Sequence, residues 1–136
     1  MELVNSFFIA AAGMRAQGER MRVVAENIAN ANSVALAPDG SPYRRKTISF
    51  TNQLDREMGV DLVRVAKIGR DNSPFKLRFE PGHPSANADG YVQYPNVNAL
   101  VEMTDMREAQ RSYQANLKVL ELTRTLAGRT LDLLRS

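Results

Sequence analysis

All six prolines of this 136-residue chain fall between residues 38 and 95. Because proline breaks or kinks a helix that it interrupts, the flanking segments are free to form long helices and the middle is not. We therefore expect a mainly α fold with a small β-rich middle, in which long N- and C-terminal helices pair as an antiparallel coiled coil. The expected division is 1–37, 38–95 and 96–136, with the first and last segments forming one helical core domain.

Residues 3–31 carry an apolar heptad repeat, which is typical of a coiled-coil seam. The stripe comprises Phe7, Ala10, Met14, Gln17, Met21, Val24, Ile28 and Ala31. Gln17 is its polar exception, and Ala11, Gly18 and Ala25 widen it with small residues that let a partner helix approach. An asparagine-rich stretch and an Asp-Gly turn signal follow, so this helix is expected to end near residues 31–36.

Residues 97–134 predict a second long helix, whose start Asn96 or Asn98 can cap. Its apolar stripe comprises Met103, Met106, Tyr113, Leu117, Leu120, Ala127, Leu131 and Leu134. Gln110 and Arg124 are the two polar breaks. We take the large apolar residues of both stripes, and not the alanines, as candidate assembly residues.

The middle predicts three short strands with half-buried faces. Residues 43–50 place Ile48 and Phe50 on one face, residues 60–68 are rich in β-branched side chains, and residues 74–80 alternate apolar and charged. A loop follows, and residues 91–94 form a short extended piece.

One pair of helices leaves much of each apolar stripe in contact with water. Burial of each such side chain contributes about 1.5–3 kcal/mol, so we expect further partners, either copies of this chain or related chains. A self-contained helical bundle is the alternative.

The polar side chains suggest no catalytic, cofactor or metal site. Arg44, Arg45 and Lys46 could bind phosphate, but a strand edge or an ionic subunit contact is the preferred interpretation. His83 has no second His or Cys, and is read as a loop residue. Two carboxylate clusters, Asp55, Glu57 and Asp61 and then Glu102, Asp105 and Glu108, alternate with arginines, as in solvated faces and ion pairs.

Composition excludes several classes of protein. There is no cysteine, hence no disulfide framework or thiolate chemistry. The net charge is +3, and basic and acidic residues are interspersed along the chain, which does not favour nucleic-acid binding by a coiled coil. The start has no basic leader typical of a cleaved signal peptide, and no membrane span is predicted. The run Phe7-Phe8-Ile9 could dip into a membrane interface, but core or coiled-coil seam is the preferred interpretation. An enzyme or secreted effector would need converging polar groups.

Four segments resemble those of bacterial flagellar axial proteins, the rod and hook subunits. Residues 25–33, AENIANANS, are similar to the signature at the end of their first helix, with Ser33 where threonine is common. Residues 40–46, residues 81–84 followed by 88–98, and residues 102–116 resemble segments of a proximal rod subunit, with Gln110 where a small residue is common. The motif residues are Asn27, Asn30, Asn32, Pro42, Tyr43, Arg44, Arg45, Gly90, Tyr91, Tyr94, Pro95, Asn96 and Asn98.

The resemblance implies a structural, non-enzymatic subunit of the flagellar basal-body rod, without cofactors. It implies export through the flagellar type III apparatus without a cleaved signal, and a place in the periplasmic rod that carries torque from motor ring to hook. The implied partners are copies of the chain, other rod proteins, the rod–export-gate adaptor and the MS-ring proteins. The terminal segments are expected to be disordered in the free monomer and to fold on assembly.

Overall fold

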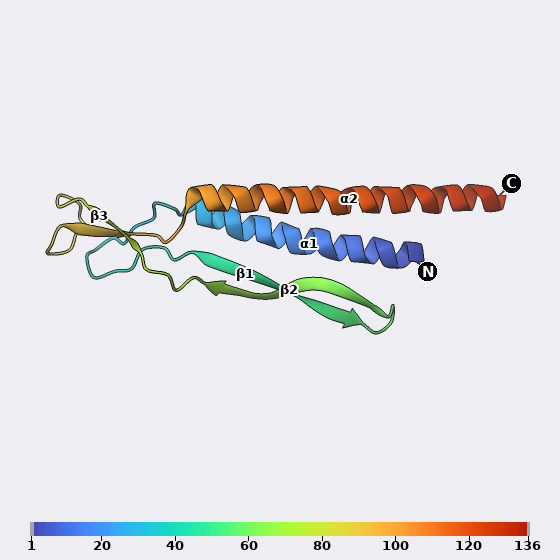
Figure 1. Ribbon diagram of the computed structural model, residues 1–136, viewed down its shortest axis with the longest axis horizontal. Helices are drawn as coiled ribbons and strands as arrows, with labels where there is room; N and C mark the ends of the chain where they lie inside the picture. Colours follow the sequence, from blue (N-terminus) through green and yellow to red (C-terminus); the bar gives the residue numbers. More distant parts are fainter. Residues whose placement is uncertain (1, 136) are drawn as a thin grey trace. The chain divides into compact units, whose positions relative to one another are not determined.

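The computed structural model describes residues 2–135. It contains two long helices, which four strands separate along the chain; Figure 1 shows the helices side by side. The element order is α1 (Glu2–Ala29), β1 (Lys46–Asp55), β2 (Val60–Arg70), β3 (Lys76–Phe79), β4 (Tyr91–Tyr94) and α2 (Ala99–Arg135). The fold is thus mainly α with a small β-rich middle, as the proline distribution predicts. No helix in the described range is both long and apolar enough to cross a membrane.

The helix ends are set by local hydrogen bonds. Asn98 caps α2 as predicted, since its Oδ1 accepts from the backbone N–H groups of Leu100 (3.1 Å) and Val101 (3.4 Å). Helix α1 ends at Ala29, slightly earlier than predicted. There the side-chain amide of Asn30 donates to the Glu26 carbonyl at 2.9 Å, which satisfies a C-terminal backbone acceptor without another helical residue.

The strands form two separate two-stranded antiparallel sheets, β1 with β2 and β3 with β4. The β1–β2 turn is closed by Asp55, whose Oδ1 accepts from the backbone of Glu57 (3.0 Å) and Met58 (3.1 Å). In the second sheet Lys76 lies opposite Tyr94 and Phe79 opposite Tyr91. The extended piece at residues 91–94 is therefore a fourth strand.

The predicted half-buried face of β3 is wrong. Leu77 and Phe79 are 60% and 64% exposed, because the buried face of this sheet is carried by Val92 of β4, which is fully covered. Alternation along the sequence identifies two faces of a strand, but it does not show which face another element covers.

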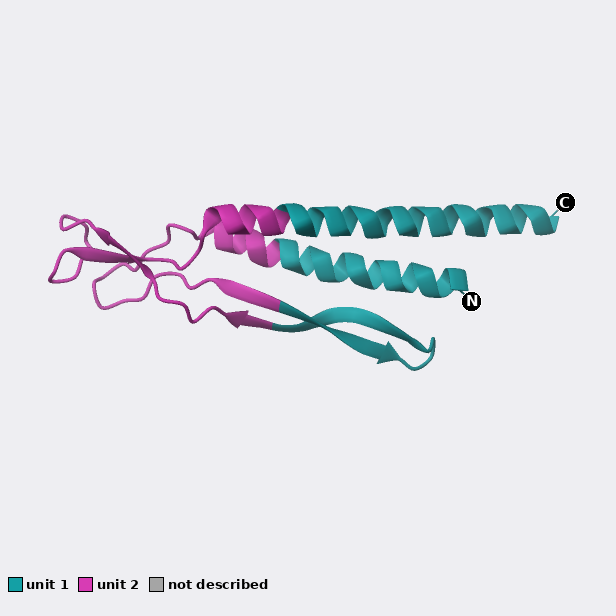
Figure 2. Ribbon diagram, viewed as in Figure 1, with its two compact units in different colours: residues 1–21, 49–67, 107–136 teal, residues 22–48, 68–106 magenta. Residues whose placement is uncertain are grey.

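The chain divides into two compact units (Figure 2). One contains residues 1–21, 49–67 and 107–136, and the other residues 22–48 and 68–106. Each helix and each strand of the first hairpin contributes to both units.

In the first unit, α1 contacts α2 on one side and the β1–β2 hairpin on another. Arg20 binds Glu108 at 3.1 Å, and a Cβ atom built on Gly13 would lie 2.8 Å from Asn116 Nδ2. On the hairpin side, Ala16 and Val63 line one groove together with their neighbours. Contact on both sides explains why the small residues Ala10, Gly13 and Ala16 are all buried.

The second unit contains the ends of the helices that flank the middle region. Its core includes Val23, Val24, Val92 and Val97, each at most 4% exposed. Polar groups are buried here as well, since Asn27 is 1% exposed and Glu102 is fully covered. All of the motif residues lie in this unit.

Candidate assembly site

A buried polar cluster joins the last turn of α1 to the start of β1. The Asn27 side chain accepts from the backbone N–H of Lys46 at 2.9 Å and donates to its carbonyl, also at 2.9 Å. The amide thus supplies both hydrogen bonds that a neighbouring strand would provide. Its oxygen also accepts from the Tyr43 hydroxyl at 2.7 Å, and burial raises the pKa of that hydroxyl.

A second asparagine, Asn96, binds the backbone N–H of the residue before Lys46. Its Oδ1 accepts from the backbone N–H of Arg45 at 2.8 Å, and its Nδ2 donates to the carbonyls of Asp71 (3.0 Å) and Ser73 (3.1 Å). The Arg45 carbonyl in turn accepts from the N–H of Asp71 at 2.8 Å. Two asparagines therefore satisfy the backbone where β1 begins, because buried peptide groups need partners.

Arg45 occupies the charged centre of the cluster. Its Nε donates to the fully buried carboxylate of Glu102, and Asp71 (3.5 Å) and Asp105 (3.8 Å) lie beside the same guanidinium. The second Glu102 oxygen accepts from Asn27 Nδ2 at 3.3 Å. Burial opposes the charge on Arg45, but the carboxylates outweigh it and raise the pKa of the guanidinium. The buried charge of Glu102 is therefore both paired and hydrogen-bonded.

Two further basic residues bind groups of the same unit. Lys46 Nζ donates to Glu26 at 2.8 Å, and this hydrogen bond lowers the pKa of the Glu26 carboxyl. Arg44 donates to the carbonyl of Asp71 at 2.9 Å and lies 4.2 Å from the centre of the Phe75 ring. The basic triplet thus makes intramolecular contacts, which neither sequence interpretation included.

The remaining motif residues shape the sheet of β3 and β4. Gly90 has a φ of 85°, and a Cβ there would lie 2.8 Å from the Phe79 ring. That ring packs edge-on against Tyr91, with centroids 5.3 Å apart. The Tyr94 hydroxyl donates to Glu80 at 3.0 Å, which raises the pKa of the hydroxyl. Pro42 and Pro95 are buried, and Asn32 is exposed.

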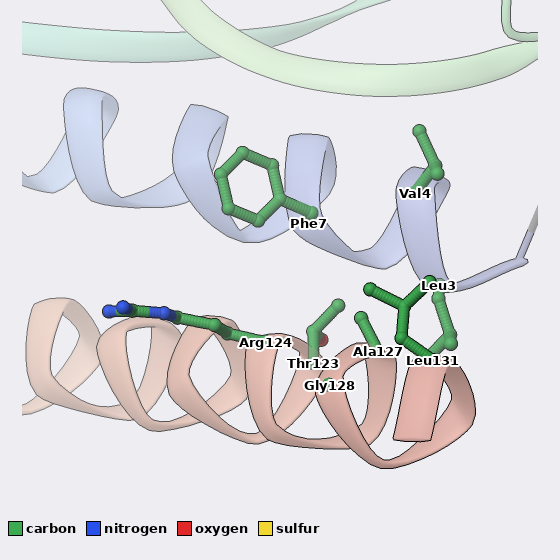
Figure 3. A pocket seen from close by; sticks show the side chains of 8 residues that line it. All are labelled: Leu3, Val4, Phe7, Thr123, Arg124, Ala127, Gly128 and Leu131. Atoms are coloured by element: carbon green, nitrogen blue, oxygen red, sulfur yellow. The ribbon is translucent and has the colours of Figure 1, made fainter. Parts of the chain in front are cut away.

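An apolar groove lies between the N-terminal end of α1 and the C-terminal part of α2 (Figure 3). It has a volume of about 490 Å³. The lining side chains are Leu3, Val4, Phe7, Thr123, Arg124, Ala127, Gly128 and Leu131. The same helices also expose the large apolar side chains of Phe8, Ile9, Leu122, Leu126, Leu133 and Leu134. A surface of this kind marks an interaction site in a soluble protein.

The candidate assembly residues differ widely in burial. Val24 is buried, and a half-buried group comprises Met14, Met21, Ile28, Met106, Tyr113, Leu117 and Leu120. An exposed group comprises Phe7, Met103, Leu131 and Leu134. On α2 the buried positions are Glu102, Ala109 and Thr123, each one residue before a position of the predicted stripe.

Sequence reasoning missed Glu102, Gly13 and Asn116. The sequence predicts Glu102 on a solvated, ion-paired face, yet its carboxylate is fully covered and its cationic partner is Arg45. The sequence predicts that Gly18 admits a partner helix, but a Cβ there would meet nothing within 4 Å, whereas one on Gly13 would meet Asn116. The position of Glu102 in the first turn of α2, close after the Asn96 and Asn98 motif, was the available signal.

Comparison with known proteins agrees with these features. Residues 88–133 match the family described as flagellar basal body rod FlgEFG protein C-terminal. Proteins named flagellar basal-body rod protein FlgC are similar along nearly the whole chain. The one from Agrobacterium fabrum is 50% identical over 94% of this chain and 92% of its own length. Those from Yersinia enterocolitica and Salmonella typhimurium are 46% and 43% identical, each over 98% of both chains. This chain therefore belongs to the FlgC family of flagellar basal-body rod proteins.

Proposed function

We propose that this chain, a structural subunit of the flagellar basal-body rod and not an enzyme, polymerises through its terminal helices into the proximal part of the drive shaft. The observation that carries the proposal is the exposed apolar surface around Phe7, Leu126 and Leu131. Burying that surface against another subunit yields about 25 cal/mol per Å². In this role the rod transmits torque from the motor ring to the hook.

We further propose that α1 and α2 pair as an antiparallel coiled coil. Two contacts in the first unit support this, because Arg20 meets Glu108 while Gly13, seven residues earlier, meets Asn116, eight residues later. When two helices run in opposite directions, residues earlier in one helix are expected to contact residues later in the other. The seam would use the apolar stripes of both helices, within the proposed core domain of residues 1–37 and 96–136.

The location and partners follow from family membership as proposals. The chain would be exported unfolded by the flagellar type III apparatus, without a cleaved signal peptide, and would be placed in the periplasmic rod. It would contact its own copies, other rod proteins, the rod–export-gate adaptor and the MS-ring proteins. The middle region, 38–95, would supply lateral contacts.

Folding on assembly would restrict polymerisation to the growing tip. Ordering a residue costs about 1–2 kcal/mol of backbone entropy, which is offset only where a partner surface exists. Circular dichroism of the dilute, full-length chain is expected to show less helix than the 28 and 37 residues of α1 and α2. Full, cooperatively melting helix in the dilute monomer would contradict this part of the proposal.

The assembly proposal is tested by a double substitution in α2. Leu117→Asp with Leu120→Asp puts two charges on half-buried seam positions and is expected to abolish rod assembly and swimming. The matched control is Lys118→Asp with Glu121→Asp, which changes net charge equally at exposed positions of the same turn. Unchanged assembly in the Leu117 and Leu120 variant would show that the seam is not the joint.

A further inference from the structure

The fully buried carboxylate of Glu102 receives hydrogen bonds from two distant parts of the chain. One comes from Arg45, just before β1, and the other from Asn27 Nδ2, 3.3 Å away in the last turn of α1. Asn27 makes that contact while also binding the backbone of Lys46 on both sides. One turn of α1, one turn of α2 and the first residues of β1 are thus held by a single cluster.

The apolar positions of the helices do not select one alignment as strictly. The stripe of α1 repeats every seven residues, and the buried positions of α2 at Glu102, Ala109 and Thr123 have the same spacing or twice it. After a slip of one heptad, the repeated positions of α1 would again face the buried positions of α2. Glu102 would then lose Asn27, and a buried charge without its donors is strongly unfavourable.

We propose that the cluster of Asn27, Arg45 and Glu102 selects the register in which α1 and α2 pair, and that these three are positioning residues for assembly. A single buried polar group has this effect in coiled coils, where it specifies register at some cost in stability. Because Asn27 also binds Lys46, the register is set only once the start of β1 is in place. The inference rests on the proposed pairing of the helices.

Engineered disulfides can determine which residues of α1 and α2 lie opposite each other, because the chain has no cysteine of its own. A Cβ on Gly13 would lie 2.9 Å from Asn116 Cγ, which brings cysteines at these two positions within disulfide range. Gly13→Cys with Asn116→Cys reports the observed register. Gly13→Cys with Ala109→Cys or with Thr123→Cys reports a slip of one heptad in either direction. Both slip reporters also carry Asn116→Ala, because the first reporter replaces Asn116 by the smaller cysteine and residue 13 should have similar space in all three.

The variant replaces the ion pair by apolar side chains of similar length, Arg45→Met with Glu102→Leu. Exchanges of this kind commonly preserve stability. Each reporter is expressed as the sole copy of the full-length chain in flagellated cells, oxidised mildly, and analysed on non-reducing gels with peptide mapping. With Arg45 and Glu102 in place, the 13–116 product is expected to exceed each slip product by at least about tenfold. In the variant that ratio is expected to fall to about threefold or less.

Each other outcome contradicts a defined step. An unchanged ratio in the variant overturns the positioning role and leaves the helix pairing intact. Loss of every cross-link in the variant alone means that the cluster serves stability only, which also overturns the inference. Absence of all three cross-links when Arg45 and Glu102 are present refutes the helix pairing itself, and the inference with it.

Discussion

The side-chain amide of Asn27 pairs with the backbone of Lys46 through two hydrogen bonds of 2.9 Å each: its Oδ1 accepts from the Lys46 N–H, and its Nδ2 donates to the Lys46 carbonyl. A helical side chain here takes the place of a neighbouring strand. The same Nδ2 also reaches Glu102, so the amide is used at both of its polar atoms. This explains in physical terms why asparagine fits that position: its donor and acceptor are both required.

Asn27→Asp is expected to destabilise the helical state by about 3 kcal/mol or more. Aspartate keeps the acceptor for Lys46 N–H, loses the donor to the Lys46 carbonyl, and places a second carboxylate beside buried Glu102. The measurement is the thermal midpoint of helix loss by circular dichroism, at a chain concentration where the helices have formed. Asn32→Asp is the matched control at an exposed motif position. Equal midpoints for the two variants would contradict the role of Asn27.

Gly90→Ala is expected to destabilise the sheet of β3 and β4 by about 1–3 kcal/mol. Two effects add there, because φ is 85° and the new Cβ would lie 2.8 Å from the Phe79 ring. A substitution at Gly59 separates the backbone effect from the steric one, since its φ is 68° but a Cβ there would meet nothing within 4 Å. Gly82 has neither a positive φ nor a neighbour within 4 Å of an added Cβ, and it serves as the control. We expect the highest thermal unfolding midpoint for Gly82→Ala, a lower one for Gly59→Ala and the lowest for Gly90→Ala. Equal loss at Gly59 and Gly90 would exclude a contribution from the ring contact.

Gln17→Met is expected to stabilise the helices by about 1 kcal/mol. Within the described residues the Gln17 Oε1 atom is buried without a hydrogen-bond partner, and methionine has nearly the same shape without that desolvated oxygen. Gln114→Met, at an exposed position of α2, is the control and should leave the thermal midpoint unchanged. A lower midpoint for Gln17→Met would indicate that the oxygen binds a group supplied on assembly.

Stability should fall on acidification below about pH 4.5, where unfolded carboxylates begin to bind protons. The Lys46 hydrogen bond lowers the pKa of Glu26, and hydrogen bonds from Ser73, followed by Arg45, lower that of Asp71. A folded-state pKa below the unfolded one gives stability that is present above the unfolded pKa and is lost as pH falls through the folded pKa. In the variant Glu26→Gln with Asp71→Asn, the thermal midpoint should decrease less between pH 6 and pH 3 than in the unsubstituted chain. An unchanged slope would assign the acid sensitivity to other groups.

The outline of the fold could be predicted because it depends on local signals. Prolines confined to the middle leave both flanks free to be helical, and Asn98 caps α2 through its own side chain. The sequence did not predict correctly which face of each element is covered by the rest of the chain. Leu77 and Phe79 alternate with charged residues as a half-buried strand would, and both are nevertheless exposed.

The sequence by itself determined two long helices around a proline-rich, strand-forming middle, and its motifs indicated the family. Only the tertiary structure decided that Glu102, which looks like a surface carboxylate, is buried. Its partners Arg45 and Asn27 are 57 and 75 residues away along the chain, so no local pattern brings them together. A buried charge is tolerated only where donors converge on it, and the fold alone places those donors.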